Sequence, residues 1–332
     1  MNESGTPVTV AAEHQRLEQQ RLEHECLRLP DGRQLSYAQY GDPAGVPVFY
    51  CHGFPGSRME ARQTDRWARE LGVRIIAFDR PGYGGSDYQP GRRLLDWPGD
   101  IAAGADALGI DRFGVLGISG GAPYALAIAS ALGNRCPAVA IVCGLGTAER
   151  HGDTVGMNGV SRGGILLGRY APSIVHAVYG GIISRYVQRK PEAIFDLLNA
   201  KSPQADRIAI AEPGLRSTIL DSVRTAFAQG GRGAARDLII YARPWGFELE
   251  SIRQRVWLWH GQQDGTVPIA FGQAMARRLP DCIAEFPEHE AHFSLPVNSA
   301  DAVLTRLRDA LIAQTPLTAP AAPALPVSPG TS

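Results

Sequence analysis

The chain has 332 residues, of which 44% are hydrophobic, and its 33 Lys and Arg residues balance 33 Asp and Glu residues. This length accommodates two domains or one large α/β domain with an insertion, and the balanced charge gives no electrostatic reason to expect nucleic acid or an anionic membrane as a partner. Five cysteines are scattered without a C-x-x-C pair, which favours reduced core thiols in a reducing compartment.

The two ends of the chain are not typical of a packed domain. Residues 1–23 are polar and charged, and they lack the basic start and apolar run of a signal peptide. No stretch reaches the roughly 18 apolar residues of a membrane span. We therefore expect a cytoplasmic protein without a membrane span. Residues 315–332 are rich in proline and poor in large apolar side chains, which predicts a disordered tail.

Apolar strand-like runs alternate with helical segments in the first half of the chain. The expected strands are residues 26–29, 33–40, 46–51, 73–78, 113–118 and 137–143, and the expected helices are residues 59–71, 94–108 and a segment that begins near Gly120. Pro30-Asp31-Gly32 predicts a hairpin turn between the first two strands. The alternation predicts an α/β fold, with a mostly parallel central sheet and helices on both faces.

The alternation stops after Gly144, and no clean strand is expected from residue 147 to 247. Helical segments can be placed at residues 174–187, 192–198, 215–228 and 234–241. A strand at 256–260, a helix at 269–279, a strand at 283–286 and a helix at 300–313 follow. We predict a core made of residues 24–146 and 248–314 with a helical cap, residues 147–247, inserted between them. The apolar residues 165–167 and 174–175 are expected to roof a pocket.

The pentapeptide Gly117-Ile118-Ser119-Gly120-Gly121 joins an expected strand directly to an expected helix. Such a G-x-S-x-G turn is sharp and strained, and its outer glycines let the helix pass close to the strand. The serine is then held at the carboxyl edge of the sheet beside a helix N-terminus, where negative charge is favoured. A second match, centred on Ser161, follows no strand. We interpret Ser119 as a nucleophile and Ser161 as an ordinary turn serine.

A serine nucleophile needs a base to take its proton. The histidines at or just after expected strands are His52, His260, His289 and His292. His292 is the predicted base, because the apolar residues 293 and 295 would fix its loop against the core. His289 is flanked by two glutamates and is expected to be solvated, whereas His260 is expected to be buried and hydrogen-bonded.

The base in turn needs an acid to orient it. Asp264 directly follows the strand at 256–260 and is the predicted acid. The plainer interpretation of Asp264 is a turn aspartate before glycine, which is a common role. Glu149 and Asp153 follow the strand before the cap and are the alternatives.

Residues 26–313 resemble α/β-hydrolase fold proteins of the esterase and lipase type. The motifs that carry the resemblance are residues 52–55 (HGFP), 79–86 (DRPGYGGS), 117–121 (GISGG), 261–268 (GQQDGTVP) and 291–293 (AHF), in the family's order of Ser, Asp and His. Many relatives have glycine where this chain has Ala291. The resemblance implies that the backbone N–H groups of Phe54 and Gly120 form an oxyanion hole, with His52 and Gly53 beside the substrate.

The resemblance implies a serine hydrolase that cleaves a small to medium neutral ester through an acyl-enzyme. Ser119 separates the chain from dehalogenases and epoxide hydrolases of this fold, which have aspartate there. Gly120 separates it from proline iminopeptidases, which usually have tryptophan after the serine. A thioesterase, a carbon–carbon hydrolase, a perhydrolase and an acyltransferase remain open. A receptor that keeps the triad but binds a small apolar ligand with little turnover is the non-enzymatic alternative.

Cofactors and partners other than substrate find no support in the sequence. The His, Cys and acidic residues show no metal-ligand spacing, so we expect no metal and no organic cofactor. Trp245 is expected either to line the pocket or to pack where the chain re-enters the core. A small-molecule substrate is the expected partner, and the oligomeric state stays open.

Overall fold

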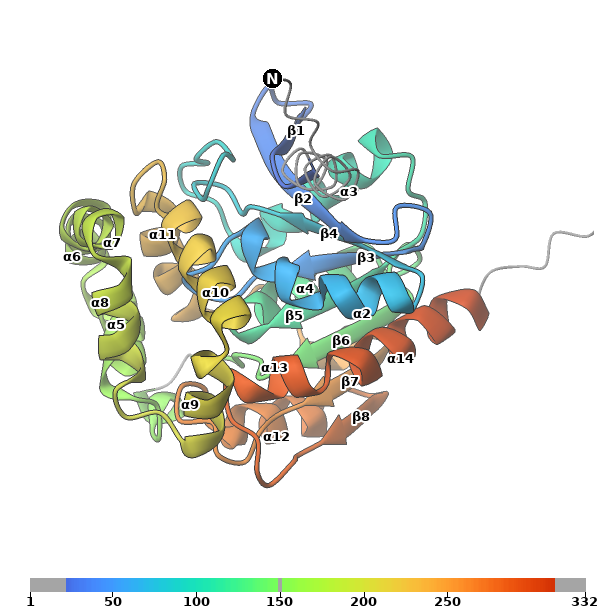
Figure 1. Ribbon diagram of the computed structural model, residues 1–332. Coiled ribbons are helices and arrows are strands. Elements are labelled where there is room, and N and C mark those ends of the chain that lie inside the picture. The colour runs from blue at the N-terminus through green and yellow to red at the C-terminus, as the bar shows by residue number, and fades with distance from the viewer. Residues whose placement is uncertain (1–21, 149–150, 314–332) are drawn as a thin grey trace, which may run out of the picture.

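The structure is a computed structural model, and it describes residues 22–148 and 151–313. Outside these ranges lie the predicted disordered tail, residues 1–21 of the polar N-terminal segment and the alternative acid Glu149. None of the described helices is long and apolar enough to cross a membrane. The described chain forms a sheet flanked by helices, with further helices gathered beyond one edge of this core (Figure 1).

Eight strands of the described chain form one sheet in the order β1-β2-β4-β3-β5-β6-β7-β8. The strands are β1 (Glu25–Arg28), β2 (Gln34–Gly41), β3 (Val46–Cys51), β4 (Val73–Phe78), β5 (Gly114–Ile118), β6 (Ala138–Val142), β7 (Arg255–Trp259) and β8 (Cys282–Glu285). Strands β1 and β2 pair antiparallel, β2 is antiparallel to β4, and the remaining pairs are parallel. Each strand lies within one residue of its expected bounds, so the sheet predicted from the sequence is confirmed.

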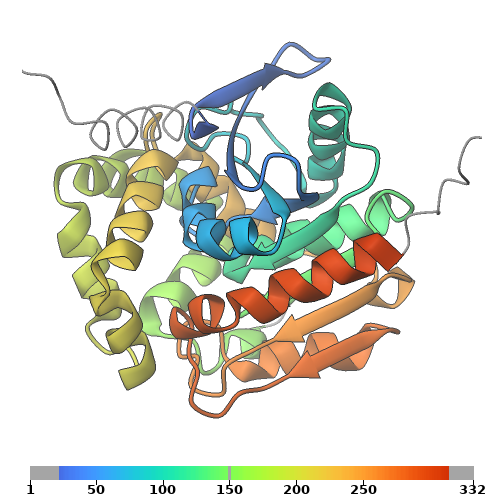
Figure 2. The same ribbon diagram turned by 45° about the vertical axis from the view of Figure 1, so that its right-hand side comes forward.

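Helices cover both faces of the sheet, which explains why β5 and β6 are buried at every position. Alternate residues of a strand point to opposite faces. In β4, Ile75 packs on the face covered by α2 (Asp65–Glu70) and α14 (Ala300–Ala313). Its neighbour Ile76 packs on the other face, which α3 (Trp97–Ala107), α4 (Ala122–Ala131) and α12 (Ile269–Arg278) cover (Figure 2).

Short helices complete the core. The 3-10 turns are η1 (Arg58–Thr64), η2 (Leu94–Asp96), η3 (Ser119–Gly121) and η6 (Leu249–Ser251), and the short α-helix α13 (Ser294–Asn298) precedes α14. The expected helices at 59–71 and 94–108 are therefore each split into a 3-10 turn and an α-helix. Pro123 lies in the first turn of α4, where its missing N–H leaves no partner unpaired.

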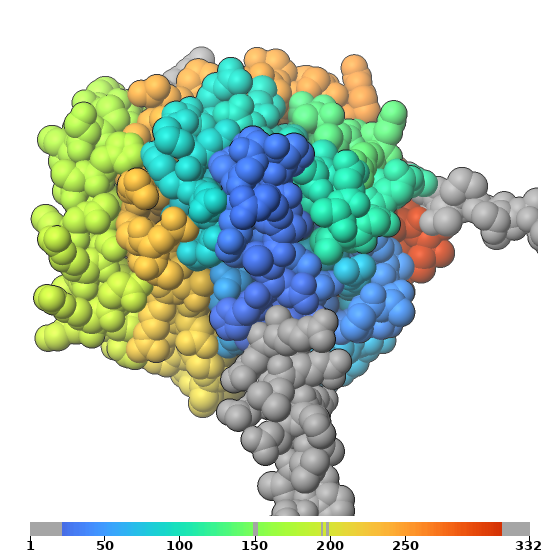
Figure 3. Space-filling model, turned by 90° about the horizontal axis from the view of Figure 1, so that it is seen from above, coloured from blue at the N-terminus to red at the C-terminus, as the bar shows by residue number. Residues whose placement is uncertain are grey.

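The segment between β6 and β7 is helical, and we call these helices the cap. They are η4 (His151–Thr154), α5 (Gly159–Tyr170), α6 (Pro172–Ala177), the π-helical turn η5 (Val178–Ile183), α7 (Ser184–Arg189), α8 (Pro191–Asn199), α9 (Gln204–Ala211), α10 (Pro213–Ala226) and α11 (Arg232–Tyr241). Seen from above, α10 and α11, in yellow and orange, lie between the yellow-green outer helices and the blue and cyan core (Figure 3). The expected helical segment between the two parts of the core is confirmed, whereas its role as a cap and its limits at residues 147 and 247 stay predictions.

The structure corrects one expectation about the cap and narrows a second one. Ser161 is not a turn serine, because it lies in the first turn of α5, where Asn158 Oδ1 accepts its backbone N–H at 2.9 Å. The expected pocket roof is also only partly right, because the side chains of Leu167 and Ile174 are exposed to solvent. Ile165, by contrast, is buried and lines the cavity between the cap and the core.

Candidate active site

Ser119 lies at the tip of the turn between β5 and α4. Its backbone has φ 52°, in the left-handed region that few non-glycine residues adopt. A Cβ atom on Gly121 would lie 2.0 Å from the carbonyl oxygen of Cys51, and one on Gly117 would lie 2.7 Å from Cβ of Ala125. Both glycines are therefore required by the close approach of helix and strand, as the sequence predicted.

His292 and Asp264 come together from two loops at the carboxyl ends of neighbouring strands. Nδ1 of His292 lies 2.8 Å from Oδ2 of Asp264, and both side chains are buried. The other carboxylate oxygen of Asp264 accepts the backbone N–H groups of Thr266 at 2.9 Å and Val267 at 2.8 Å. These bonds fix the carboxylate, which leaves Oδ2 to orient the imidazole ring.

The electrostatics of this pair favour a charged histidine. Burial alone would lower the pKa of His292, but the negative charges of Asp264, Asp206 and Glu60 outweigh it and hold the pKa above its ordinary value. Burial would likewise raise the pKa of Asp264, but the facing His292 dominates and lowers it. The pair is therefore suited to a histidine that gains a proton during a reaction.

A cavity of about 310 Å³ lies between the core and the cap, and Ser119 and His292 both line it. Gly53, Phe54 and Gly120 line the same cavity on the core side. Its other walls are largely apolar side chains of the cap and the loop after β6: Leu145, Met157, Val160, Ile165, Tyr179, Ile183, Val187, Phe195, Leu220, Val223, Phe227 and Leu238. The predicted nucleophile and base thus share one apolar, cap-covered space.

The loop after β3 is held by its own polar contacts. The N–H of Gly53 donates to both carboxylate oxygens of Glu60, at 3.0 and 3.1 Å, and Arg80 donates to the carbonyls of His52 at 2.5 Å and Gly53 at 3.0 Å. The N–H of Phe54 donates to no acceptor within the described residues. A Cβ atom on Gly120 would lie 2.8 Å from Cβ of Phe54, so the two predicted oxyanion residues are neighbours.

Beneath this loop lies a charged cluster that the sequence did not reveal. Its centre is Asp237 of the cap helix α11, which is fully buried. Asp237 accepts hydrogen bonds from Arg80 at 2.9 Å, from Tyr83 at 2.8 Å, from Tyr124 at 2.6 Å and from Arg92. Burial opposes its charge, but the two arginines outweigh burial and lower the pKa of Asp237. The carboxylate is therefore ionised and paired.

Tyr241, one turn after Asp237, links this cluster to the turn that holds the serine. Its hydroxyl donates to the carbonyl of Gly120 at 2.9 Å and lies 3.2 Å from Asp237. A Cβ atom on Gly120 would approach the Tyr241 oxygen to 2.7 Å. Glycine at position 120 is therefore needed for contact with the cap as well as for the turn itself.

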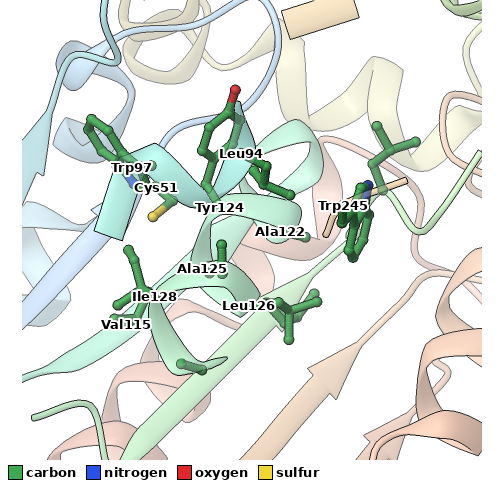
Figure 4. Packing of buried hydrophobic residues seen from close by; sticks show 14 of the residues in the cluster. Cys51, Leu94, Trp97, Val115, Ala122, Tyr124, Ala125, Leu126, Ile128 and Trp245 are labelled. Atoms are coloured by element: carbon green, nitrogen blue, oxygen red, sulfur yellow. The ribbon is translucent and has the colours of Figure 1, made fainter. Parts of the chain in front are cut away.

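Two predicted substrate-binding residues lie away from the cavity. His52 is fully buried, with Nδ1 3.0 Å from the carbonyl of Gly53, and it does not line the cavity. Trp245 packs with Phe247 and belongs to the buried cluster around α4 (Figure 4). Of the two expectations for Trp245, the structure therefore shows packing in the core.

The remaining histidines lie as the sequence suggested. His260 is buried, with Nε2 2.7 Å from the carbonyl of Val267, and His289 is exposed. The alternative acid Asp153 lies in η4.

Cys143 lies directly beneath the histidine–aspartate pair. Among the described residues, Cys143, Asp264 and His292 form the one group whose potential metal-ligating atoms lie within 4.8 Å of one another. Burial raises the pKa of the Cys143 thiol well above its ordinary value, and the thiol donates to the carbonyl of Ala291 at 3.5 Å.

Comparisons with known sequences agree with this architecture. A family model described as alpha/beta hydrolase fold matches residues 46–298. A proline iminopeptidase from Xylella fastidiosa is 38% identical over 111 residues, which are 32% of this chain and 35% of that protein. A dihydrolipoyllysine-residue acetyltransferase component of an acetoin cleaving system, from Cupriavidus necator, is 28% identical over 255 residues, 74% of this chain and 58% of that protein. The matches span only about a third of the proline iminopeptidases.

Solved structures share the fold over most of the chain. A thermophilic esterase from Thermogutta terrifontis has a TM-score of 0.65 at 19% identity, covering 86% of this chain and 99% of that one. An esterase from Exiguobacterium antarcticum has a TM-score of 0.64 at 20% identity, covering 87% and 99%. With the family match over residues 46–298, the sheet order and the strained turn at Ser119, the chain belongs to the alpha/beta hydrolase fold family.

Proposed function

We propose that the protein is a serine hydrolase that cleaves small to medium neutral esters through an acyl-enzyme. The observation that carries the proposal is that Ser119, on its strained turn, shares one cavity with His292, whose far ring nitrogen is bound to Asp264. A serine, a histidine and a carboxylate in this relation are the components of a catalytic triad.

The proposed reaction has two halves. Oγ of Ser119 attacks the acyl carbonyl while Nε2 of His292 takes the proton of the Ser119 hydroxyl. Asp264 stabilises the resulting imidazolium by accepting its Nδ1–H. The N–H groups of Phe54 and Gly120 donate to the oxyanion. The imidazolium then protonates the leaving alcohol. In the second half, His292 activates a water molecule that hydrolyses the acyl-enzyme and restores the serine.

The cavity supports the proposed substrate class. Its volume of about 310 Å³ and its apolar walls suit a small or medium acyl or alcohol group. Glu60 also lines the cavity, and burial raises its pKa. The largely apolar walls would not solvate a substrate carboxylate, which disfavours anionic esters.

Acyl transfer is the second candidate function. The similarity to the acetyltransferase component named above extends over 74% of this chain, more than its similarity to the proline iminopeptidase. The same acyl-enzyme would then react with an acceptor thiol or alcohol instead of water. Product analysis with and without such an acceptor separates transfer from hydrolysis.

The test uses turnover of a short-chain aryl ester and labelling with a fluorophosphonate. Ser119→Ala is expected to lose turnover on the order of 10⁶-fold, because the members of a triad act as a unit. The exposed cap residue Ser217 provides the matched control, since Ser217→Ala should retain wild-type turnover. The fluorophosphonate should label Ser119 and leave Ser161 unmodified. A label on Ser161, or wild-type turnover in Ser119→Ala, would contradict the proposal.

A further inference from the structure

Asp206 in cap helix α9 binds the loop that carries the predicted base. Its side chain is buried, with 1% of the residue exposed. One carboxylate oxygen accepts the backbone N–H of His292 at 3.2 Å. The other accepts the N–H groups of Phe293 at 2.7 Å and Ser294 at 3.0 Å. A single cap carboxylate therefore binds three successive backbone donors of the core.

These donors would otherwise lack partners. They lie at the start of α13 (Ser294–Asn298), where the first N–H groups of a helix have no acceptor within the helix. Leaving even one of them unpaired in a buried place costs stability. Asp206 lies 86 to 88 residues earlier in the chain, so only the docked cap can supply it.

The cap adds an apolar contact to the same loop. The ring of Phe293 packs edge-on against Phe195 of α8, with centroids 6.2 Å apart. On the core side, the hydroxyl of Ser294 accepts the N–H of Ala291 at 2.9 Å. The loop around His292 is therefore held between the cap and its own turn, with Asp206 as its charged contact.

The charged and titratable groups that face His292 come from several elements. Asp264 lies on the loop after β7, Asp206 on α9 and Glu60 on η1, and all three attract a positive imidazole. Burial lowers the pKa of the neighbouring His260, which disfavours a second positive charge beside His292. The thiol of Cys143 is protonated. Asp206 is thus the cap's own contribution to the charge around the base.

We propose that Asp206 is a positioning residue, which fixes the His292 loop from the cap and favours, by its charge, the imidazolium that forms during catalysis. The inference rests on the proposed role of His292 as the base. If Asp206 has this role, His292 can act as a base only when the cap is packed against the core. The cap then does more than cover the substrate. The cap then influences the rate of the chemical step as well as the choice of substrate.

The test is Asp206→Asn, compared with Asp196→Asn on the neighbouring helix α8. Asparagine keeps an acceptor for two of the N–H groups but removes the charge and turns an amide N–H₂ toward the third. Ester turnover should fall about tenfold to a hundredfold in kcat, with KM changed much less, because a charge-assisted bond is lost. The acid limb of the kcat/KM profile should move to lower pH, because a negative charge near His292 has gone. Asp196 is exposed and pairs with Arg216, so Asp196→Asn should match the wild type.

Three controls make each outcome decisive. Urea unfolding establishes that Asp206→Asn is folded under the assay conditions. If it is not, Asp206→Glu decides, since it keeps the charge and should keep the wild-type acid limb while kcat falls. Fluorophosphonate labelling of Ser119 and loss of turnover in His292→Ala test the proposed function separately.

Unchanged kcat and an unmoved acid limb in folded Asp206→Asn would overturn the inference while leaving the proposed function intact. A uniform loss at every pH, with the limb in place, would reduce Asp206 to a structural role and also overturn it. A shift of the acid limb of the kcat/KM profile in Asp206→Glu would also overturn the inference.

Discussion

Replacing Asp237 by asparagine should destabilise the protein more than any exposed charge substitution in the cap. Asp237 is fully buried between Arg80 and Arg92, whose guanidinium groups are themselves almost completely buried. Asp237→Asn preserves the shape of the side chain and removes its charge. The two arginines would then face each other without a counter-ion, in a place that water does not reach.

The size of the effect follows from the cost of an unpaired buried charge. Removing one partner of a buried ion pair typically costs about 3–5 kcal/mol. Asparagine can still accept from one tyrosine of the cluster, so we expect the lower end, about 3 kcal/mol. This is a large share of the roughly 5–15 kcal/mol that holds a typical domain folded.

Urea unfolding, followed by tryptophan fluorescence, measures the effect as a shift of the midpoint at constant m value. Glu192→Gln is the matched control, because Glu192 pairs with Arg224 at the cap surface with about half of each side chain exposed. Exposed pairs contribute about 0–1 kcal/mol, so this variant should unfold close to the wild type.

The pH dependence of the free energy of unfolding tests independently whether the charge of Asp237 stabilises the folded protein. The pKa of Asp237 is lower in the folded protein than in the unfolded chain, so its contribution is complete above the unfolded pKa of about 4. It is lost only as the pH falls toward the folded value. The difference between wild type and Asp237→Asn should therefore stay constant from about pH 6 to 8. A difference below about 1 kcal/mol would refute the reasoning.

Two further predictions concern the proposed chemistry. His292→Ala should abolish ester turnover, whereas His289→Ala should retain it because the His289 side chain is exposed. Wild-type turnover should fall as the pH drops through the pKa of His292, which lies above its ordinary value of about 6.5. Across an acyl series, kcat/KM should rise about fourfold per methylene, as expected from about 0.8 kcal/mol per buried CH₂, until the cavity of about 310 Å³ is full. Full activity in His292→Ala, or a flat acyl profile, would contradict the respective prediction.

The sheet could be predicted because its signals are local. Each strand is a short apolar run bounded by turn residues, and the G-x-S-x-G turn has strict steric requirements. Hence the strands were placed to within one residue, and the strained backbone at Ser119 was expected. The proximity of His292 to Asp264 also followed, since the carboxyl ends of parallel strands share one edge of the sheet.

The cap helices were harder to predict from the sequence, because tertiary packing overrides the local helix propensity there. Helix α5 contains four glycines, which disfavour an isolated helix. A Cβ atom on Gly168 would lie 2.3 Å from the carbonyl oxygen of Leu238 in α11, so this glycine permits two helices to touch. The benefit of that contact depends on a helix some 70 residues away, as the residue numbers show, which no local window includes.

The resemblance to a family predicts on which loop a residue lies, but not the direction in which its side chain points. His52 occupies the motif position that suggested a substrate contact, but its ring lies under Arg80 and Tyr83 instead of facing the cavity. Trp245 likewise points into the core. Positions within a motif therefore predicted which loop forms the site more reliably than which side chains reach it.

Asp206 and Asp237 show why the supporting groups of this site were not predictable. Each is a single aspartate in an ordinary amphipathic helix, and its partners in the core lie 86 or more residues away in sequence. One binds the loop of the predicted base, and the other binds, through Arg80 and Tyr241, the loops that flank the predicted nucleophile. Because both are buried acceptors for core donors, the cap cannot separate from the core without exposing charges and backbone groups that then need water. The residues proposed for the chemistry belong to the core, but the cap supplies the contacts that hold them in place.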